Sequence, residues 1–201
     1  MNPTQVRHSA LKAQLIAVTQ GQIDRVGFSA VRARDVAAAA ECSVGTLYTL
    51  FDDLTALILA VNIKTFQALE AEIEHVISSD SAPLCPEDRL RAMARSYLDF
   101  AIAHPMRWRA LFELEMSAKT PVPDQYGVAA GRVLSLIAQP LRELAPDAPA
   151  ERIHTVARGV FSAVHGIVLL GLDSRVTRIP RDELDEMICL TVTAMIAVAT
   201  R

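Results

Sequence analysis

The chain has 201 residues, of which 51% are hydrophobic, and a formal net charge of −3. A chain of this length can bury a sizeable core. Its slightly acidic charge excludes a protein that covers nucleic acid without sequence preference, but it does not exclude a small DNA-reading segment. Its three widely spaced cysteines predict a reduced, cytoplasmic location and no metal site, and its longest apolar runs, 159–172 and 187–199, are shorter than a membrane span, so we expect no membrane partner.

The fold class is predicted to be all-α, because alanine, leucine, arginine and glutamate dominate and hydrophobic residues rarely alternate with period two. A first helix is expected from Gln5 to Val26. Near its start Arg7, His8 and Lys12 point outward, where they either contact phosphate groups or are ordinary solvated surface charges.

Two short helices are expected next, over residues 34–40 and 44–50, with a tight turn between them. Ser43 can cap the second helix through its hydroxyl group. A helix this short is marginal in water, so Leu47 and Phe51 must pack inward to hold it. The outward face then carries small, hydroxyl-bearing and aromatic groups, as a helix-turn-helix presents them to the DNA major groove: Gly45, Thr46, Tyr48 and Thr49.

The stretch Gly45-Thr46-Leu47-Tyr48, with Arg34-Asp35-Val36-Ala37 before it and Phe51 after it, closely resembles the DNA-binding segment of TetR-type transcriptional regulators. The resemblance runs from residue 5 or so to residue 60. It implies a homodimer that binds a palindromic DNA operator through a helix-turn-helix domain, residues 1–52.

Tyr48 and Thr46 are the strongest candidates for DNA contact, because the resemblance places such residues on phosphates or bases; Tyr48 could instead pack its ring on the first helix. The chain departs from the family pattern at Arg32, where a Thr or Ser cap is usual, at Glu41, where the turn usually has glycine, and at Leu54, where lysine is frequent. Missing cations remove phosphate contacts, so we expect weaker and less salt-sensitive binding than in a well-charged relative. The complete DNA-binding set predicted is Arg32, Arg34, Ser43, Gly45, Thr46, Tyr48 and Thr49.

A long amphipathic helix is expected from Asp53 to Ser78, followed by a polar loop that ends at Pro83. Proline accompanied by acidic residues then marks a helix start four times, and His104-Pro105 adds a further break. We therefore predict helices at 87–103, 106–117, 124–145, 150–173 and 181–199, which makes about nine helices in all.

Residues 53–201 are expected to form an effector-binding and dimerisation domain. Within it Trp108 and the pair His165-Gly166 resemble the marker residues of an effector domain named for Trp, His and Gly. Packing in the core is the commoner role for any one aromatic or methionine side chain, but Trp108 and His165 each bring a polar tip that a ligand can satisfy. We predict a small hydrophobic or aromatic effector, in a pocket formed by Met93, Tyr97, Phe100, Trp108, Phe112, Met116, Phe161 and His165.

The last two predicted helices, 150–173 and 181–199, favour self-association. The second is apolar nearly all round from Met187 onward, which requires cover on more than one side. The core covers one side, and we expect a twofold partner to cover the other. A single recognition helix reads only half of a palindromic site, so DNA binding predicts the same homodimer.

Catalysis is not predicted, because the sequence has no glycine-rich phosphate loop, no metal-spaced cluster and no serine or cysteine with an evident base. We expect neither an enzyme nor a cofactor. The predicted function is a ligand-responsive transcriptional regulator, in most cases a repressor. A protein of another class also fits the sequence: an all-α ligand carrier or protein-interaction module that has lost sequence-specific DNA binding.

Overall fold

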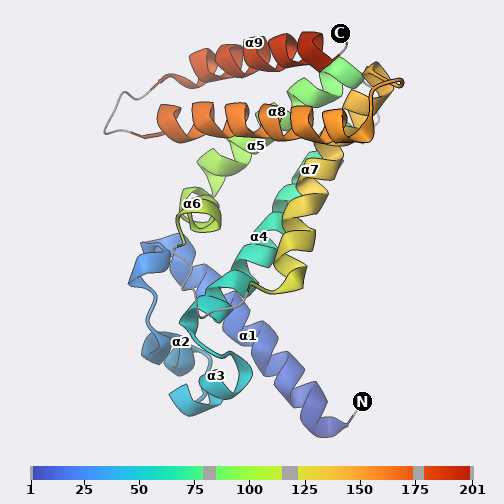
Figure 1. Cartoon of the computed structure of the whole chain (residues 1–201). Coiled ribbons are helices and arrows are strands. Elements are labelled where there is room, and N and C mark those ends of the chain that lie inside the picture. Colours follow the sequence, from blue (N-terminus) through green and yellow to red (C-terminus); the bar gives the residue numbers. More distant parts are fainter. Residues whose placement is uncertain (1, 79–84, 115–121, 174–178, 200–201) are drawn as a thin grey trace. The chain divides into compact units, whose positions relative to one another are not determined.

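The computed structural model describes residues 2–78, 85–114, 122–173 and 179–199. Within these ranges the chain forms nine α-helices, one short 3-10 helix and no strand, which confirms the all-α prediction (Figure 1). The elements are, in chain order, α1 (Pro3–Val26), η1 (Phe28–Ala30), α2 (Ala33–Ala39), α3 (Val44–Leu50), α4 (Leu54–Ile77), α5 (Pro86–Ala103), α6 (Pro105–Glu113), α7 (Asp124–Leu144), α8 (Ala150–Gly171) and α9 (Arg181–Ala199).

Helix boundaries agree with the predicted ones to within two residues at nearly every end. The exception is α6, which ends at Glu113 although the sequence predicts a helix through residue 117. The short helix η1 was not predicted either. It follows Gly27, whose φ of +80° is a conformation that glycine adopts without steric cost, so the chain leaves α1 by a tight bend there.

The chain divides into two compact units. Unit 1 contains Met1–Gln67 and His104–Ala129, and unit 2 contains Ala68–Ala103 and Ala130–Arg201. Helices α4 and α7 each contribute one end to each unit. The domain boundary predicted from the sequence, after residue 52, is a different division, because it separates a DNA-binding domain from an effector domain by function. That functional boundary stays a prediction.

The core of unit 1 forms where α1, α2, α3 and the first half of α4 bring together fully buried aliphatic side chains, among them Leu15, Val36, Leu47 and Leu57. Leu47 is the buried residue of the seven-residue helix α3, as expected for a helix that is held by packing. The hydroxyl group of Ser43 accepts a hydrogen bond from the backbone N–H of Thr46 at 3.0 Å, which confirms the predicted cap.

Helix α6 belongs to unit 1 and is bonded there at two points. Arg107 forms an ion pair with Asp24 of α1 at 2.6 Å, and the buried side chain of Asn62 on α4 donates a hydrogen bond to the carbonyl oxygen of Ala110 at 2.7 Å. Pro105 starts the helix at a position where a missing N–H costs nothing. The short helix α6 therefore has fixed partners on both α1 and α4.

In unit 2, α8 and α9 run side by side (Figure 1). Two glycines of α8 allow this close packing. A Cβ atom added at Gly159 would lie 2.8 Å from the Met195 side chain, and one added at Gly171 would overlap Leu184. Gly159 and Gly171 thus serve packing within one protomer, in addition to any contact with a second one.

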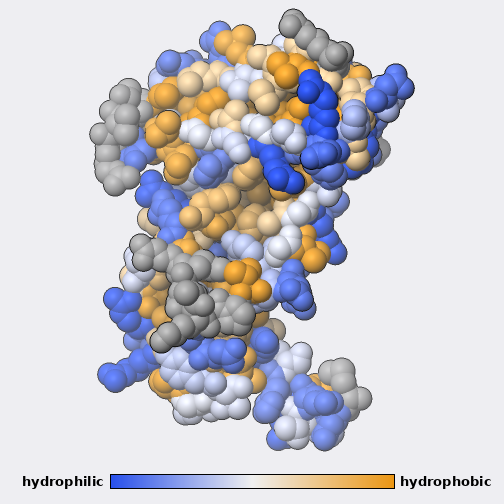
Figure 2. Space-filling view, viewed as in Figure 1, coloured by the Kyte–Doolittle hydropathy of each residue, from blue (hydrophilic) through white to orange (hydrophobic). Residues whose placement is uncertain are grey.

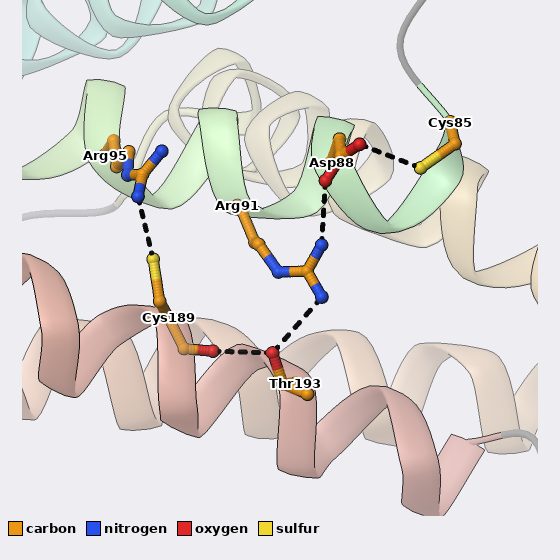
Figure 3. A network of polar contacts seen from close by, with 6 residues as sticks. All are labelled: Cys85, Asp88, Arg91, Arg95, Cys189 and Thr193. Atoms are coloured by element: carbon orange, nitrogen blue, oxygen red, sulfur yellow. Dashed lines mark hydrogen bonds and ion pairs between the residues drawn. The ribbon is translucent and has the colours of Figure 1, made fainter.

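Helix α5 contacts α9 through polar side chains (Figure 3). The guanidinium group of Arg95 donates hydrogen bonds to Asp185 at 2.8 Å and to the sulfur of Cys189 at 3.2 Å, and Arg91 reaches Thr193 at 3.3 Å. The opposite face of α5 is apolar and buried. Helix α5 therefore presents one polar and one apolar face to its neighbours in unit 2.

By length and composition alone, α4 and α8 could each cross a membrane, although the unbroken apolar runs of the sequence are shorter. Within α4, however, Asn62 and Thr65 are fully buried, and their side chains donate to carbonyl oxygens of Ala110 and Val61. Buried polar side chains that donate to carbonyl oxygens are typical of a helix in a protein core, although Oδ1 of Asn62 has no hydrogen-bond partner among the described residues.

A backbone constraint at Glu41 generates the first testable prediction. The backbone N–H of Glu41 donates to the carbonyl oxygen of Ala38, and the N–H of Cys42 donates to that of Ala37. This helix-ending motif requires one residue in the left-handed backbone conformation, and Glu41 adopts that conformation with a φ of +53°. The change Glu41→Gly removes the clash of the Cβ atom, so we expect it to raise the free energy of unfolding by about 1 kcal/mol, measured by urea titration.

The matched control is Glu41→Ala, which removes the charge but keeps the Cβ atom. We expect it to give no comparable gain. An equal gain from both variants would show that the charge, and not the backbone, is the cause.

Candidate DNA-reading face and effector cavity

The outward face of α3 carries the residues predicted to read DNA. Tyr48 is 46% exposed, so part of its side chain is accessible to solvent. The hydroxyl groups of Ser43 and Thr46 are 2.8 Å apart, and that of Thr49 donates to the carbonyl oxygen of Gly45 at 2.9 Å. The hydroxyl groups of Ser43, Thr46 and Thr49 are therefore engaged in local hydrogen bonds, and Tyr48 stays exposed to solvent on this face.

The two arginines of the predicted DNA-binding set differ in their surroundings. Arg32 precedes α2, and its guanidinium group donates to the carbonyl oxygens of Ser29 and Val31 at 2.8 and 2.9 Å. It therefore fastens the loop that leads into α2. Arg34 is exposed on α2 itself. A DNA-contacting role for either arginine stays a prediction.

Two lysines of unit 1 line one surface groove between α1 and α4. The ammonium group of Lys12 lies 5.0 Å from the centre of the Phe51 ring, a cation–π contact that holds it against the core of the unit. Lys64 of α4 lies along the same groove. Lys64 was not predicted to belong to this groove, because no local sequence pattern relates it to Lys12, 52 positions earlier.

A small cavity of about 30 Å³ lies within unit 2, between α4, α5, α7 and α8. Space of this size holds a water molecule or two, whereas pockets for small organic ligands measure roughly 300–1,000 Å³. A ligand must therefore push the wall apart to enter. The wall is formed by Ile73, Leu90, Met93, Ala94, Tyr97, Val133, Ile137, Val160, Phe161 and Val164.

The predicted pocket residues are only partly brought together. Three of them, Met93, Tyr97 and Phe161, line the cavity, and His165 joins them through Tyr97. Phe100 is fully buried in unit 2 but is not part of the wall. Trp108 and Phe112 are residues of unit 1 and contact each other, with ring centres 5.8 Å apart, and Met116 lies outside the described residues.

A polar pair of side chains from two helices lies beside the cavity, and one member, Tyr97, lines it. The Tyr97 hydroxyl group lies 2.7 Å from Nδ1 of His165, a hydrogen bond whose direction depends on the histidine tautomer. The ring of Phe161 stacks on that of His165, with centres 5.8 Å apart and planes inclined by 16°. Burial lowers the pKa of His165 below the ordinary imidazole value, which favours the neutral ring.

Metal binding finds no support in this arrangement. Among the described residues no three histidine, cysteine, aspartate or glutamate side chains form a group that could hold a metal ion. The polar groups of the cavity suit hydrogen bonding with an organic molecule.

One comparison with known proteins identifies a family. A family model described as the tetracyclin repressor-like C-terminal domain matches residues 90–195. Among curated protein sequences none matches significantly.

Several solved structures share the fold. A protein of unknown function from Rhodococcus sp. RHA1 is 20% identical, with a TM-score of 0.74 over 95% of this chain and 96% of that one. A tetR-family transcriptional regulator from Streptomyces coelicolor is 23% identical, with a TM-score of 0.70 over 95% and 82% of the two chains. RolR, solved with the ligand resorcinol, is 14% identical, with a TM-score of 0.66 over 96% and 89%.

The lowered pKa of His165 generates a prediction about acid stability. In the unfolded chain His165 has the ordinary pKa near 6.5, whereas in the folded chain its pKa is lower. Between these two values the unfolded chain binds the proton more readily. The free energy of unfolding therefore falls as the pH drops through this window. The change His165→Asn keeps an acceptor near the position of Nδ1 but does not titrate. We expect its urea midpoint to fall less than that of the wild type between pH 7 and pH 5.

The control is His154→Asn on the exposed face of the same helix, which should retain the pH dependence of the wild type. Equal pH dependence of the wild type and the His165 variant would contradict the prediction.

Proposed function

Because the chain belongs to the TetR family of transcriptional regulators, whose C-terminal domain model matches more than half of it, we propose that it binds a palindromic DNA operator as a homodimer and is released by a small hydrophobic or aromatic effector. The family is one of regulators and not of enzymes. We infer repression as the mode of control and the cytoplasm as the location. The observation that supports DNA binding most strongly is α3, a helix capped by Ser43 and packed through Leu47, with its other face in solvent.

Within α3, Tyr48 and Thr46 are proposed to contact the operator. A tyrosine ring can lie on a thymine methyl group or on sugar while its hydroxyl group reaches a phosphate, and a threonine offers both a hydroxyl and a methyl group. Gly45 lets the backbone come close to DNA. In a homodimer the two copies of α3 then read half-sites about 34–36 Å apart, or a multiple of that distance.

The proposed dimer forms through α8 and α9. Hydrophobic side chains remain exposed on these helices, namely Leu170, Leu190 and Val198. The face visible in Figure 2 likewise exposes hydrophobic residues among polar ones in this region. Exposed apolar area on neighbouring helices favours association, and a second copy of α8 and α9 would cover it.

The cavity of unit 2 is the proposed effector site. Its wall, apolar except for Tyr97, suits a hydrophobic or aromatic molecule, and the resorcinol bound by the similarly folded RolR is consistent with such a ligand. A ligand that reverses a 1:99 equilibrium between two states must prefer one of them by about 5.5 kcal/mol. The Trp-His-Gly subtype, suggested by Trp108 and His165-Gly166, stays a prediction.

A carrier or protein-interaction module is the second candidate function. It is favoured by the absence of lysine and arginine from α3, whose sequence is Val-Gly-Thr-Leu-Tyr-Thr-Leu. With few cations near the operator, phosphate contacts are few and non-specific attraction is weak. Selection of bound sequences from a random duplex pool separates the two functions, because a module that has lost DNA recognition enriches nothing even at low salt.

The change Tyr48→Ala should weaken operator binding by about 10- to 100-fold, as expected for the loss of one good base or phosphate contact in each half-site. Binding is measured by fluorescence anisotropy on the selected duplex. The control is Val26→Ala, which shortens a side chain of similar exposure on α1, 51% against 46% for Tyr48, and should bind normally. Equal affinity of both variants would remove Tyr48 from the interface.

The scarcity of cations predicts a shallow salt dependence. We expect the slope of log K against log salt concentration to be smaller in magnitude than about 8 for the dimer, because each phosphate contact contributes about one unit. A steeper slope would mean that cations outside α3, such as those of α1 and α2, make extensive phosphate contacts.

The change Leu190→Glu should convert the dimer to a monomer and abolish operator binding, because it places a charge on the exposed face of α9, where Leu190 is 65% exposed. The mass in solution is measured by light scattering after gel filtration. Val128→Glu is the control, since Val128 is 56% exposed on α7 and lies outside the proposed interface. Dimers in both variants would contradict the assignment to α8 and α9.

A further inference from the structure

The polar pair beside the cavity in unit 2, Tyr97 and His165, has a definite geometry. Tyr97 from α5 and His165 from α8 share the hydrogen bond of 2.7 Å, and Phe161 contacts both rings, edge-on to Tyr97 with centres 5.8 Å apart and stacked on His165. Tyr97 and Phe161 also line the cavity. Tyr97 is thus a residue of an otherwise apolar wall, and its hydroxyl group is bonded to a histidine beside that wall.

Charge is disfavoured at this site. None of the ten described residues of the wall carries a charge, and Tyr97 alone among them has a polar side chain. The neighbouring His165 has a lowered pKa, so at pH 7 it supplies no positive charge either. A carboxylate or ammonium group that enters such a space loses its hydration without gaining a counter-ion.

A hydroxyl group on the ligand suits the Tyr97–His165 pair better than a carbonyl group does. When Nδ1 of His165 carries no hydrogen, the Tyr97 hydroxyl group donates to it and can accept a hydrogen bond from a ligand. When Nδ1 carries a hydrogen, the Tyr97 hydroxyl group accepts from it and can donate a hydrogen bond to a ligand. A ligand hydroxyl can take either part. A carbonyl group can only accept.

We propose that the effector of this cavity is an uncharged, mostly apolar molecule with one hydroxyl group, which hydrogen-bonds to the hydroxyl group of Tyr97. This inference rests on the proposed function, and it adds the chemical class of the ligand. The cavity then selects against organic acids and amines of the same size. It also selects, less strongly, against the matching hydrocarbon.

The experiment measures direct binding to the full chain without DNA, by isothermal titration calorimetry at pH 7. The probes are 2-naphthol, 2-naphthoate and 2-methylnaphthalene, with 1-octanol and octanoate as an aliphatic pair. We expect the hydroxyl compound of at least one series to bind about 100-fold more tightly than its carboxylate, and 2-naphthol, where the naphthyl body fits, to bind about fivefold more tightly than 2-methylnaphthalene. A carboxylate that binds as well as the alcohol, or no binding of either alcohol, would overturn the proposal.

Two variants locate the contact. Tyr97→Phe should reduce the preference for the hydroxyl compound over the hydrocarbon to less than twofold, and Ala94→Leu should fill the cavity and weaken both compounds. Tyr126→Phe is the matched control: its hydroxyl group donates to the carbonyl oxygen of Leu111 at 3.1 Å in unit 1, so its loss should leave the preference unchanged. Loss of the preference in the control as well would refute the role of Tyr97.

The same probes separate this inference from the proposed function. Selective binding of an alcohol by a chain that enriches no DNA sequence would support the ligand class and refute the regulator. Operator binding that is released by the carboxylates but not by the alcohols would support the regulator and refute the ligand class.

Discussion

A helix of seven residues does not persist alone in water, and the construction of unit 1 follows from this limit. Helix α3 is held at its start by the hydroxyl group of Ser43, on its inner side by the buried Leu47, and from the preceding turn by the hydrogen bonds that end α2. Because packing uses the inner side, the outer side is left for Tyr48 and its neighbours. The same few residues that stabilise the helix thus determine which side chains it presents.

Most helices of this chain could be predicted from the sequence, because their starts carry local signals. Pro105 opens α6, and Ser43 caps α3 where its hydroxyl group can reach a backbone N–H. The end of α1 was predicted correctly at Val26, before Gly27, but η1 had no comparable signal. It depends on how the end of α1 meets the segments that follow.

The candidate site was predictable only in part, for a physical reason. Helical spacing shows which face of a helix is buried but not which neighbour covers it. Met93, Tyr97 and Phe161 were recognised as large apolar or aromatic residues on buried faces, whereas Ile137 and Val164 look like any aliphatic core residue. The pairing of Tyr97 with His165 joins positions 68 residues apart, and Trp108, chosen by the same reasoning, belongs to unit 1.

Helix α5 contributes the apolar wall of the cavity on one side and ionic contacts to α9 on the other. The contacts of Arg95 with Asp185 and of Arg181 with Asp99 are partly exposed, so dissolved ions screen them, whereas ions hardly affect the buried face with Met93. Phosphate contacts to DNA weaken with ionic strength for the same reason. Under the proposed function, the ionic composition of the cell acts at two places, on the proposed phosphate contacts with the operator and on the ion pairs that anchor α9, whereas the cavity proposed for the effector is shielded from it.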